Sequence, residues 1–248
     1  MKILGIETTS KGVGVAVIER GRLIAEYYLE TDKYTHLEKL IPMVDKVLKD
    51  LRVNLEDING IAVSVGPGSF TGIRIGIACA QGISQALKIP IIPVNTLDSL
   101  AYNVRSESLI CPVIDAQRKD VYAALFRWEG EELVKVWDYV ILNSKVLLKN
   151  LRDLEKEVIL VGDGAQKVFA VENNDNNVNL LLIKQELLYT MPRASSVAMI
   201  GFNKFLRGEK CDGFSVKPFY MRKSHAEEKW EERHGKEILT RDSNRFDD

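Results

Sequence analysis

The chain has 248 residues, enough for one large domain or two small ones, and its hydrophobic fraction of 46% and charged fraction of 28% are ordinary for a protein with an apolar core. The formal net charge of -1 excludes a basic surface over the whole molecule for nucleic acid or membranes and leaves only a local patch. No stretch approaches the ~18 unbroken apolar residues of a membrane span, and the isolated cysteines Cys79, Cys111 and Cys211 indicate a reducing compartment, so we expect a cytoplasmic protein.

The first part of the chain reads as one α/β unit. Three short apolar runs predict strands joined as a meander, at residues 2–7, 12–19 and 23–30. A helix is expected over 35–51, because apolar residues recur there at helical spacing and Thr35 with Glu38 forms a capping box. The elements predicted after it are a strand over 58–66, a helix over 71–87, a strand over 89–95 and a short helix over 96–105.

The second part of the chain repeats this order. A buried strand over 109–116 ends in a carboxylate, as the strand over 2–7 does. The elements that follow are a hairpin over 120–142, a helix over 144–156 and a strand, glycine turn and helix start over 158–168. We therefore predict an internal duplication, although α/β chains also repeat such patterns without one.

The duplication suggests how the chain is divided. We expect an N-terminal subdomain at 1–104, a C-terminal subdomain at 105–224 and a charged tail at 225–248. Within the second subdomain, residues 173–179 read as a polar loop. A helix over 194–207 is expected to end at Gly208.

The stretch 64–76, "SVGPGSFTGIRIG", is a glycine-rich turn between a strand and a helix, where phosphate groups often bind. It lacks the Gly-Lys-Ser/Thr ending of a P-loop and the GxGxxG spacing, and Phe70 is bulky for a phosphate loop. Phosphate binding and a purely structural turn both stay open. The candidate residues for weak nucleotide binding, with the acids at two strand ends, are Glu7, Gly66, Gly68, Ser69, Thr71, Arg74 and Asp115.

Glu7 and Asp115 occupy matching positions in the two halves. Paired carboxylates across a cleft can hold a metal–phosphate complex or act as a general base. Alternatively, each carboxylate caps its own turn, beside Thr8–Thr9 or Gln117–Arg118. The sequence leaves both interpretations open.

Metal ligands and nucleophiles are not indicated. The three histidines, His36, His225 and His234, form no HxxxH or HExxH motif, and no cysteine lies at ligand spacing from them. No GxSxG motif is present either. We predict no metal site and no catalytic residue.

Several of these segments together resemble one family. The segments "ILGIETTS", "THLEKLIPMV", "SVGPGSFTGIRIGIACAQGISQAL", "IPVNTLDSLA", "DAQRKDVYAALF" and "KPFYMRKSHAE" are similar to the bacterial TsaB (YeaZ) family, over residues 1 to about 228. The resemblance implies a duplicated actin/Hsp70/hexokinase-like α/β fold with the ribonuclease H-like motif. It also implies a non-catalytic role in making N6-threonylcarbamoyladenosine (t6A) in tRNA.

The resemblance implies partners as well. Such proteins bind a catalytic paralogue, TsaD, work with the ATPase TsaE, reach tRNA indirectly and form homodimers when TsaD is absent. The first helix and the helix after the glycine turn are expected to form the contact. The implied interface residues are His36, Leu40, Val44, Val47, Gly72, Ile73, Gly76, Ile77 and Ala80.

One motif of the catalytic paralogue is missing here. Its metal-binding HxxxH pair would fall on Thr96 and Leu100, and neither residue type suits a transition metal. Glu7–Thr8 departs the other way, because most TsaB-like chains have Asp-Thr there and the catalytic paralogue begins "GIET". We expect no cofactor, with ATP bound only weakly or at a shared interface. The alternatives are a kinase or ATPase of the same fold and, less favoured, a metalloprotease.

Overall fold

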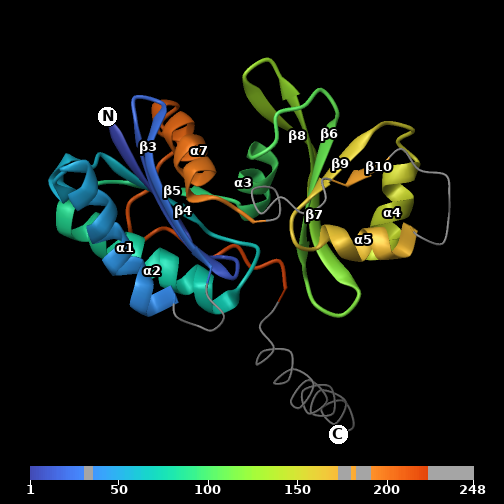
Figure 1. Ribbon diagram of the computed structural model, residues 1–248, viewed down its shortest axis with the longest axis horizontal. Helices are drawn as coiled ribbons and strands as arrows, with labels where there is room; N and C mark the ends of the chain where they lie inside the picture. Colours follow the sequence, from blue (N-terminus) through green and yellow to red (C-terminus); the bar gives the residue numbers. More distant parts are fainter. Residues whose placement is uncertain (31–35, 173–179, 183–190, 223–248) are drawn as a thin grey trace, which may run out of the picture.

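The computed structural model describes residues 1–30, 36–172, 180–182 and 191–222. Two lobes, each built on a five-stranded mixed sheet, lie side by side (Figure 1). No helix within these ranges is long and apolar enough to cross a membrane. The polar loop predicted at 173–179 and the charged tail predicted at 225–248 lie outside the described residues.

The first lobe has the strand order β3-β2-β1-β4-β5. Its strands are β1 (Lys2–Glu7), β2 (Gly12–Glu19), β3 (Arg22–Glu30), β4 (Gly60–Ser64) and β5 (Ile91–Val94). The first three form the predicted antiparallel meander, and β4 and β5 continue the sheet in parallel. Helices α1 (His36–Leu51) and α2 (Phe70–Leu87) cover one face, and α7 (Ala194–Leu206) covers the other (Figure 1). A 3₁₀ turn, η1 (Leu55–Asp57), precedes β4.

The second lobe repeats this topology, with the order β8-β7-β6-β9-β10. Its strands are β6 (Leu109–Asp115), β7 (Asp120–Glu129), β8 (Glu132–Asn143), β9 (Val158–Val161) and β10 (Leu180–Leu182). Helices α4 (Ser144–Arg152) and α5 (Ala165–Glu172) correspond to α1 and α2. Helix α3 (Thr96–Tyr102) lies between the lobes (Figure 1). The predicted duplication is confirmed.

Helix α7 comes from the predicted C-terminal subdomain but packs on the first sheet, against β1, β2 and β4. Small residues permit this approach. A side chain at Gly5 would overlap Ala194 O, and one at Gly201 would overlap Cβ of Ala62. The sheet is consequently buried on both sides, with Ile3 and Ala16 toward α7 and Leu4 and Ile6 toward α1 and α2.

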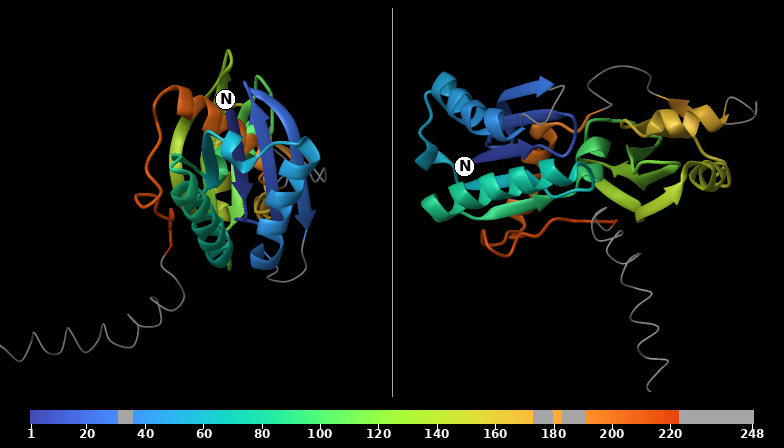
Figure 2. Two further views of the ribbon diagram at one scale, coloured as in Figure 1. Left: turned by 90° about the vertical axis from the view of Figure 1, so that its left-hand side faces the viewer. Right: turned by 90° about the horizontal axis from the view of Figure 1, so that it is seen from below.

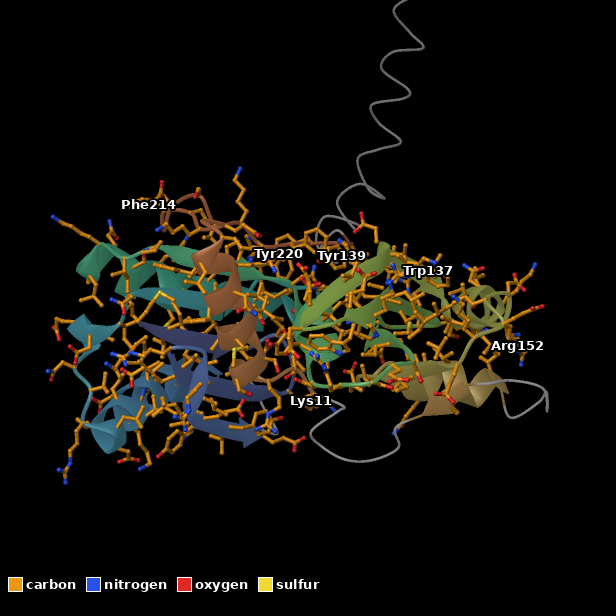
Figure 3. The ribbon with its side chains drawn as sticks, turned by 90° about the horizontal axis from the view of Figure 1, so that it is seen from above. Lys11, Trp137, Tyr139, Arg152, Phe214 and Tyr220 are labelled. Atoms are coloured by element: carbon orange, nitrogen blue, oxygen red, sulfur yellow. The ribbon has the colours of Figure 1, made fainter. Side chains whose placement is uncertain are left out.

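The segment 207–222, here called the C-terminal segment, runs from the first lobe to the second. Cys211 pairs with Ile91 of the edge strand β5, and Phe219 N donates to Val65 O at 2.7 Å. The Phe219 ring meets Tyr139 of β8 edge-on, with centroids 5.4 Å apart. Arg222 donates to Ala116 O at 2.8 Å and to Asp120 Oδ2 at 2.6 Å in the second lobe. Tyr220 and Tyr139 mark this crossing in Figure 3.

Candidate functional site

Glu7 ends β1 and is fully buried. Its Oε1 accepts hydrogen bonds from Thr9 N at 2.6 Å and from the Thr9 hydroxyl, and Ser64 donates to Oε2. Burial raises the pKa of Glu7, and these hydrogen bonds oppose the rise. The chain itself surrounds this carboxylate, so Glu7 caps its own turn, and nucleotide binding by Glu7 stays a prediction.

Asp115 forms the same turn at the end of β6. Its Oδ1 accepts from Gln117 N at 2.6 Å, two residues on, as Glu7 accepts from Thr9 N. Asp115 is partly exposed, and Lys167 of α5 forms an ion pair with it. The capping interpretation thus describes both acids. The two halves share even this hydrogen bond, from the backbone N–H two residues on to the carboxylate at the strand end.

The glycine turn packs against the chain's own backbone. Gly66 has φ +113, and a side chain there would meet Phe219 O at 2.7 Å. A side chain at Gly68 would overlap Thr9 O, and one at Gly72 would overlap Thr8 O. The glycines therefore allow the strand-end loop after β1 and the C-terminal segment to approach closely.

Two amides at the start of α2 are bonded within the chain. Ser69 N donates to Thr9 O at 2.7 Å, and Gly72 N donates to the Ser69 hydroxyl at 3.2 Å. A phosphate at a helix start needs such amides unpaired. Thr71 and Arg74 are exposed on the first turns of α2. The amides of Ser69 and Gly72 are thus not available to a phosphate, and nucleotide binding by this set of residues stays a prediction.

The two positions onto which the resemblance would place the HxxxH pair of the catalytic paralogue lie in the interior. Thr96 and Leu100 of α3 are 1% and 0% exposed, respectively, and Thr96 Oγ1 has no hydrogen-bond partner. Within the described ranges, no three His, Cys, Asp or Glu side chains gather closely enough to hold a metal ion.

The residues predicted for the partner contact lie inside the first lobe. Those at most 5% exposed in its core are Leu40, Val44, Val47, Ile73, Ile77 and Ala80. Gly72 and Gly76 are buried too and face Thr8. Within this chain these side chains therefore pack in the core, whereas the family resemblance implies that they lie at the partner interface. The side chain of His36 lies outside the described residues, and a partner contact by α1 and α2 stays a prediction.

A second four-residue series on α2 points the other way. Arg74, Ala78, Gly82 and Ala86 are all exposed and lie opposite the buried series of Gly72, Gly76, Ala80 and Ser84. We call the exposed series the outward face of α2. A side chain added at Gly82 would meet nothing within 4 Å. Seen from below in Figure 2, α2 lies between α1 and the C-terminal segment.

Arg74 begins this face and is held in place by two rings. Its guanidinium carbon lies 3.9 Å from the Phe70 centroid, and Nε donates to the Tyr220 hydroxyl at 2.9 Å. Tyr220 stacks on Phe70, with centroids 4.6 Å apart. No local sequence pattern predicts this cluster, because Tyr220 lies far from Phe70 and Arg74 along the chain.

A cavity of about 170 Å³ lies where α3, α7 and β8 meet. In its wall, the Tyr139 hydroxyl donates to Asp98 Oδ1 at 2.8 Å. Burial raises the pKa of Asp98, which this hydrogen bond opposes, and burial with the neighbouring Asp98 raises the pKa of Tyr139. The pair joins α3 to the second lobe.

The sheet order and the sequence together define the class of protein. A family model described as TsaD, tRNA N6-adenosine threonylcarbamoyltransferase, matches residues 30–230. With two copies of one five-stranded topology, this is a duplicated α/β protein of the TsaD-like class, and the predicted duplicated α/β fold is confirmed.

Relatives that match over nearly their whole length identify the family within this class. The chain is 31% identical, over 93% of its length and 98% of the relative's, to the tRNA threonylcarbamoyladenosine biosynthesis protein TsaB of Bacillus subtilis (strain 168). The protein of the same name from Escherichia coli (strain K12) is also 31% identical, with 96% of this chain and all of that protein covered. The chain belongs to the TsaB (YeaZ) family.

A solved structure agrees with this placement. A Pseudomonas aeruginosa protein described as similar to peptidase YEAZ superposes with a TM-score of 0.77 at 25% identity, covering 89% of this chain and 99% of that one. A second structure, YeaZ from Pseudomonas aeruginosa, gives a TM-score of 0.74 at 24% identity, with the same coverage. Both share the two-lobed fold.

Proposed function

We propose that this chain is a non-catalytic subunit for t6A biosynthesis in tRNA, acting in the cytoplasm beside a TsaD-type catalytic paralogue and the ATPase TsaE. The names of the relatives support the pathway, because both full-length relatives are called tRNA threonylcarbamoyladenosine biosynthesis proteins. The net charge of -1 favours indirect contact with tRNA, through the partner.

The interior of α3 supports the non-catalytic role. A catalytic metal needs ligands such as imidazole or carboxylate that face an open site. Thr96 and Leu100 offer a hydroxyl and an alkyl group, both buried. The chain therefore supports the reaction by binding and positioning the subunit that carries it out.

The observation that carries the proposal is the outward face of α2. From Ile75 to Leu87 the helix has no charged residue, although a solvent-exposed helix face is normally charged. The neighbouring α1 shows the usual pattern, with Lys46–Asp50 and Lys49–Asp45 ion pairs on its surface. An uncharged helix face of small residues is typical of a protein contact rather than of solvent.

Gly82 further supports a protein contact at the outward face of α2. Glycine inside a helix costs about 1 kcal/mol relative to alanine. The fold gives nothing in return at this position, because no atom lies near an added side chain. A helix packed against the open side of Gly82 would account for the residue, since glycine lets two backbones approach closely.

We assign this face to the TsaD-type paralogue. The family model that matches most of this chain is the TsaD model, so the paralogue shares the two-lobed architecture and can present an equivalent pair of helices. Self-association through the same face is the expected state of the isolated chain, and heterodimer formation would replace it.

The test places an arginine on the face. Gly82→Arg should leave the fold intact, because the site is open and arginine is a better helix former. It should abolish co-elution with the paralogue in size-exclusion chromatography with light scattering. The matched control is Val146→Arg, at a 45% exposed position on α4 of the second lobe, which should bind normally. If the wild-type chain does not co-elute with the paralogue, the proposed function is refuted. If the Gly82→Arg variant still co-elutes, the assignment of the contact to the outward face of α2 is refuted.

Calorimetry separates this function from the kinase or ATPase alternative. We propose that the isolated subunit does not hold ATP at the glycine turn, since the amides of Ser69 and Gly72 are bonded within the chain. Titration with Mg-ATP at millimolar concentration should give no heat of binding. Saturable tight binding by the isolated chain would instead favour the enzyme reading.

A further inference from the structure

Arg74 is an exposed cation that the fold has fixed in one orientation. Its guanidinium stacks on the Phe70 ring, and the Tyr220 hydroxyl accepts a hydrogen bond from its Nε. An exposed arginine normally loses side-chain freedom when it binds a partner, and this loss weakens binding. Here that freedom is already restricted in the folded chain.

In the part of the chain that the structure describes, Arg74 donates through Nε alone, which leaves its two terminal nitrogens unpaired there. Within the described ranges, no carboxylate forms an ion pair with this residue. Arg105 makes a clear contrast. It lies over the Trp128 ring at 4.0 Å in the same manner, but its terminal nitrogen bonds to Gly130 O and to Glu131 Oε1. Arg105 is paired with a carboxylate of its own chain, and Arg74 presents a planar fork of donors.

The position of Arg74 indicates which chemical group its terminal nitrogens bind. It begins the outward face of α2, which continues through Ala78, Gly82 and Ala86 without another charge. A single cation at the edge of an uncharged contact face requires an acceptor on the partner, because burying it unpaired would be costly. The planar geometry of guanidinium matches a carboxylate with two parallel hydrogen bonds.

A free phosphate fits the surroundings less well. A phosphate site needs converging donors, and the nearby amides of Ser69 and Gly72 are bonded within the chain. Arg74 lines neither the cavity beside Tyr139 nor the groove of about 640 Å³ between α2 and residues 210–214. It stands on an open surface, where a protein partner can reach it from outside.

We propose that Arg74 is the charged anchor of the partner contact and receives an Asp or Glu carboxylate of the TsaD-type paralogue, with Phe70 and Tyr220 as positioning residues. The inference rests on the proposed function, which supplies the partner. It adds the residue that sets the orientation of the contact and the chemical group that this residue recognises.

The test measures heterodimer affinity by calorimetry, in buffer free of nucleotide and phosphate. Arg74→Ala should weaken binding about 10- to 100-fold. Arg74→Lys should recover only part of the loss, since it keeps the charge without the planar fork. Arg105→Ala is the matched control, an exposed arginine over an aromatic ring on the other lobe, and should change the affinity less than about twofold.

Two further measurements identify the acceptor. Substituting the acidic residues of the paralogue singly by alanine should reveal one whose loss is not additive with that of Arg74→Ala. Tyr220→Phe should weaken binding less than Arg74→Ala does, because it frees Nε without removing the charge.

The outcomes test the role of Arg74 separately from the proposed function on which it rests. If the wild-type chain fails to bind the paralogue, the proposed function fails. If the wild-type chain binds and Arg74→Ala binds equally well, the function stands and the anchor is refuted. An effect of Arg74→Ala that arises only after Mg-ATP is added would also overturn the inference, since it would assign the fork to a phosphate.

Discussion

Gly76→Ala and Gly82→Ala make the same chemical change on the same helix, six residues apart, and we expect opposite effects on stability. Both remove a helix-interior glycine, which stabilises by about 1 kcal/mol where the space is open. At Gly82 nothing lies within 4 Å of the new methyl group. Gly82→Ala should therefore raise the free energy of unfolding by about 1 kcal/mol, or the melting temperature by about 2–4 °C at this chain length.

At Gly76 the methyl group would overlap the Thr8 hydroxyl and approach Cγ2 of Val63 at 3.5 Å. Thr8 is fully buried, and its hydroxyl donates to Gly72 O at 2.7 Å, so it cannot move without breaking that bond. A lost buried hydrogen bond and overpacking each cost about 1–3 kcal/mol, against about 1 kcal/mol gained by the helix. Gly76→Ala should lower the free energy of unfolding by about 2 kcal/mol. Urea denaturation followed by circular dichroism measures both, and equal effects would refute the distinction between inward and outward faces.

The remaining predictions concern the junction of the lobes. Tyr139→Phe should lower the free energy of unfolding by about 1–3 kcal/mol at pH 7, because it removes the hydrogen bond to the buried Asp98. That bond lowers the pKa of Asp98, so the variant's carboxyl takes up a proton at higher pH and the deficit should shrink toward pH 4; urea denaturation at both pH values tests this, and an unchanged deficit would contradict it. Arg222→Ala should speed amide hydrogen exchange in residues 115–120, where Arg222 bonds to Ala116 O and Asp120, and unchanged exchange would show that the C-terminal segment does not hold this loop.

Local patterns predicted the two halves of the fold well. Apolar runs, turn residues and the repeated order of elements were sufficient for the duplicated sheets, because each signal lies within a short window. The position of α7 could not be predicted in this way. Its apolar face would suit either sheet, and its partners Ile3, Ala16 and Ala62 lie far away in the sequence.

The candidate site was predicted in part. Small residues do recur every fourth position on α2, but the helix carries two such series. The family resemblance assigns the partner contact to the series that faces inward. Burial in the folded chain distinguishes them: Ile73 and Ile77, beside Gly72 and Gly76, pack in the core of the first lobe. The ring contact between Arg74 and Tyr220 needs tertiary structure and has no local signal.

The placement of α7 has a consequence for synthesis on the ribosome. The chain emerges from its N-terminus, so β1, β2 and β4 can pair long before residues 194–206 are made. Until then, the face of the first sheet that carries Ile3, Ala16 and Ala62 has no cover from its own chain. The lobe that is translated first is therefore completed last, and a nascent chain stalled before Ala194 would expose an apolar sheet face of the kind that chaperones recognise.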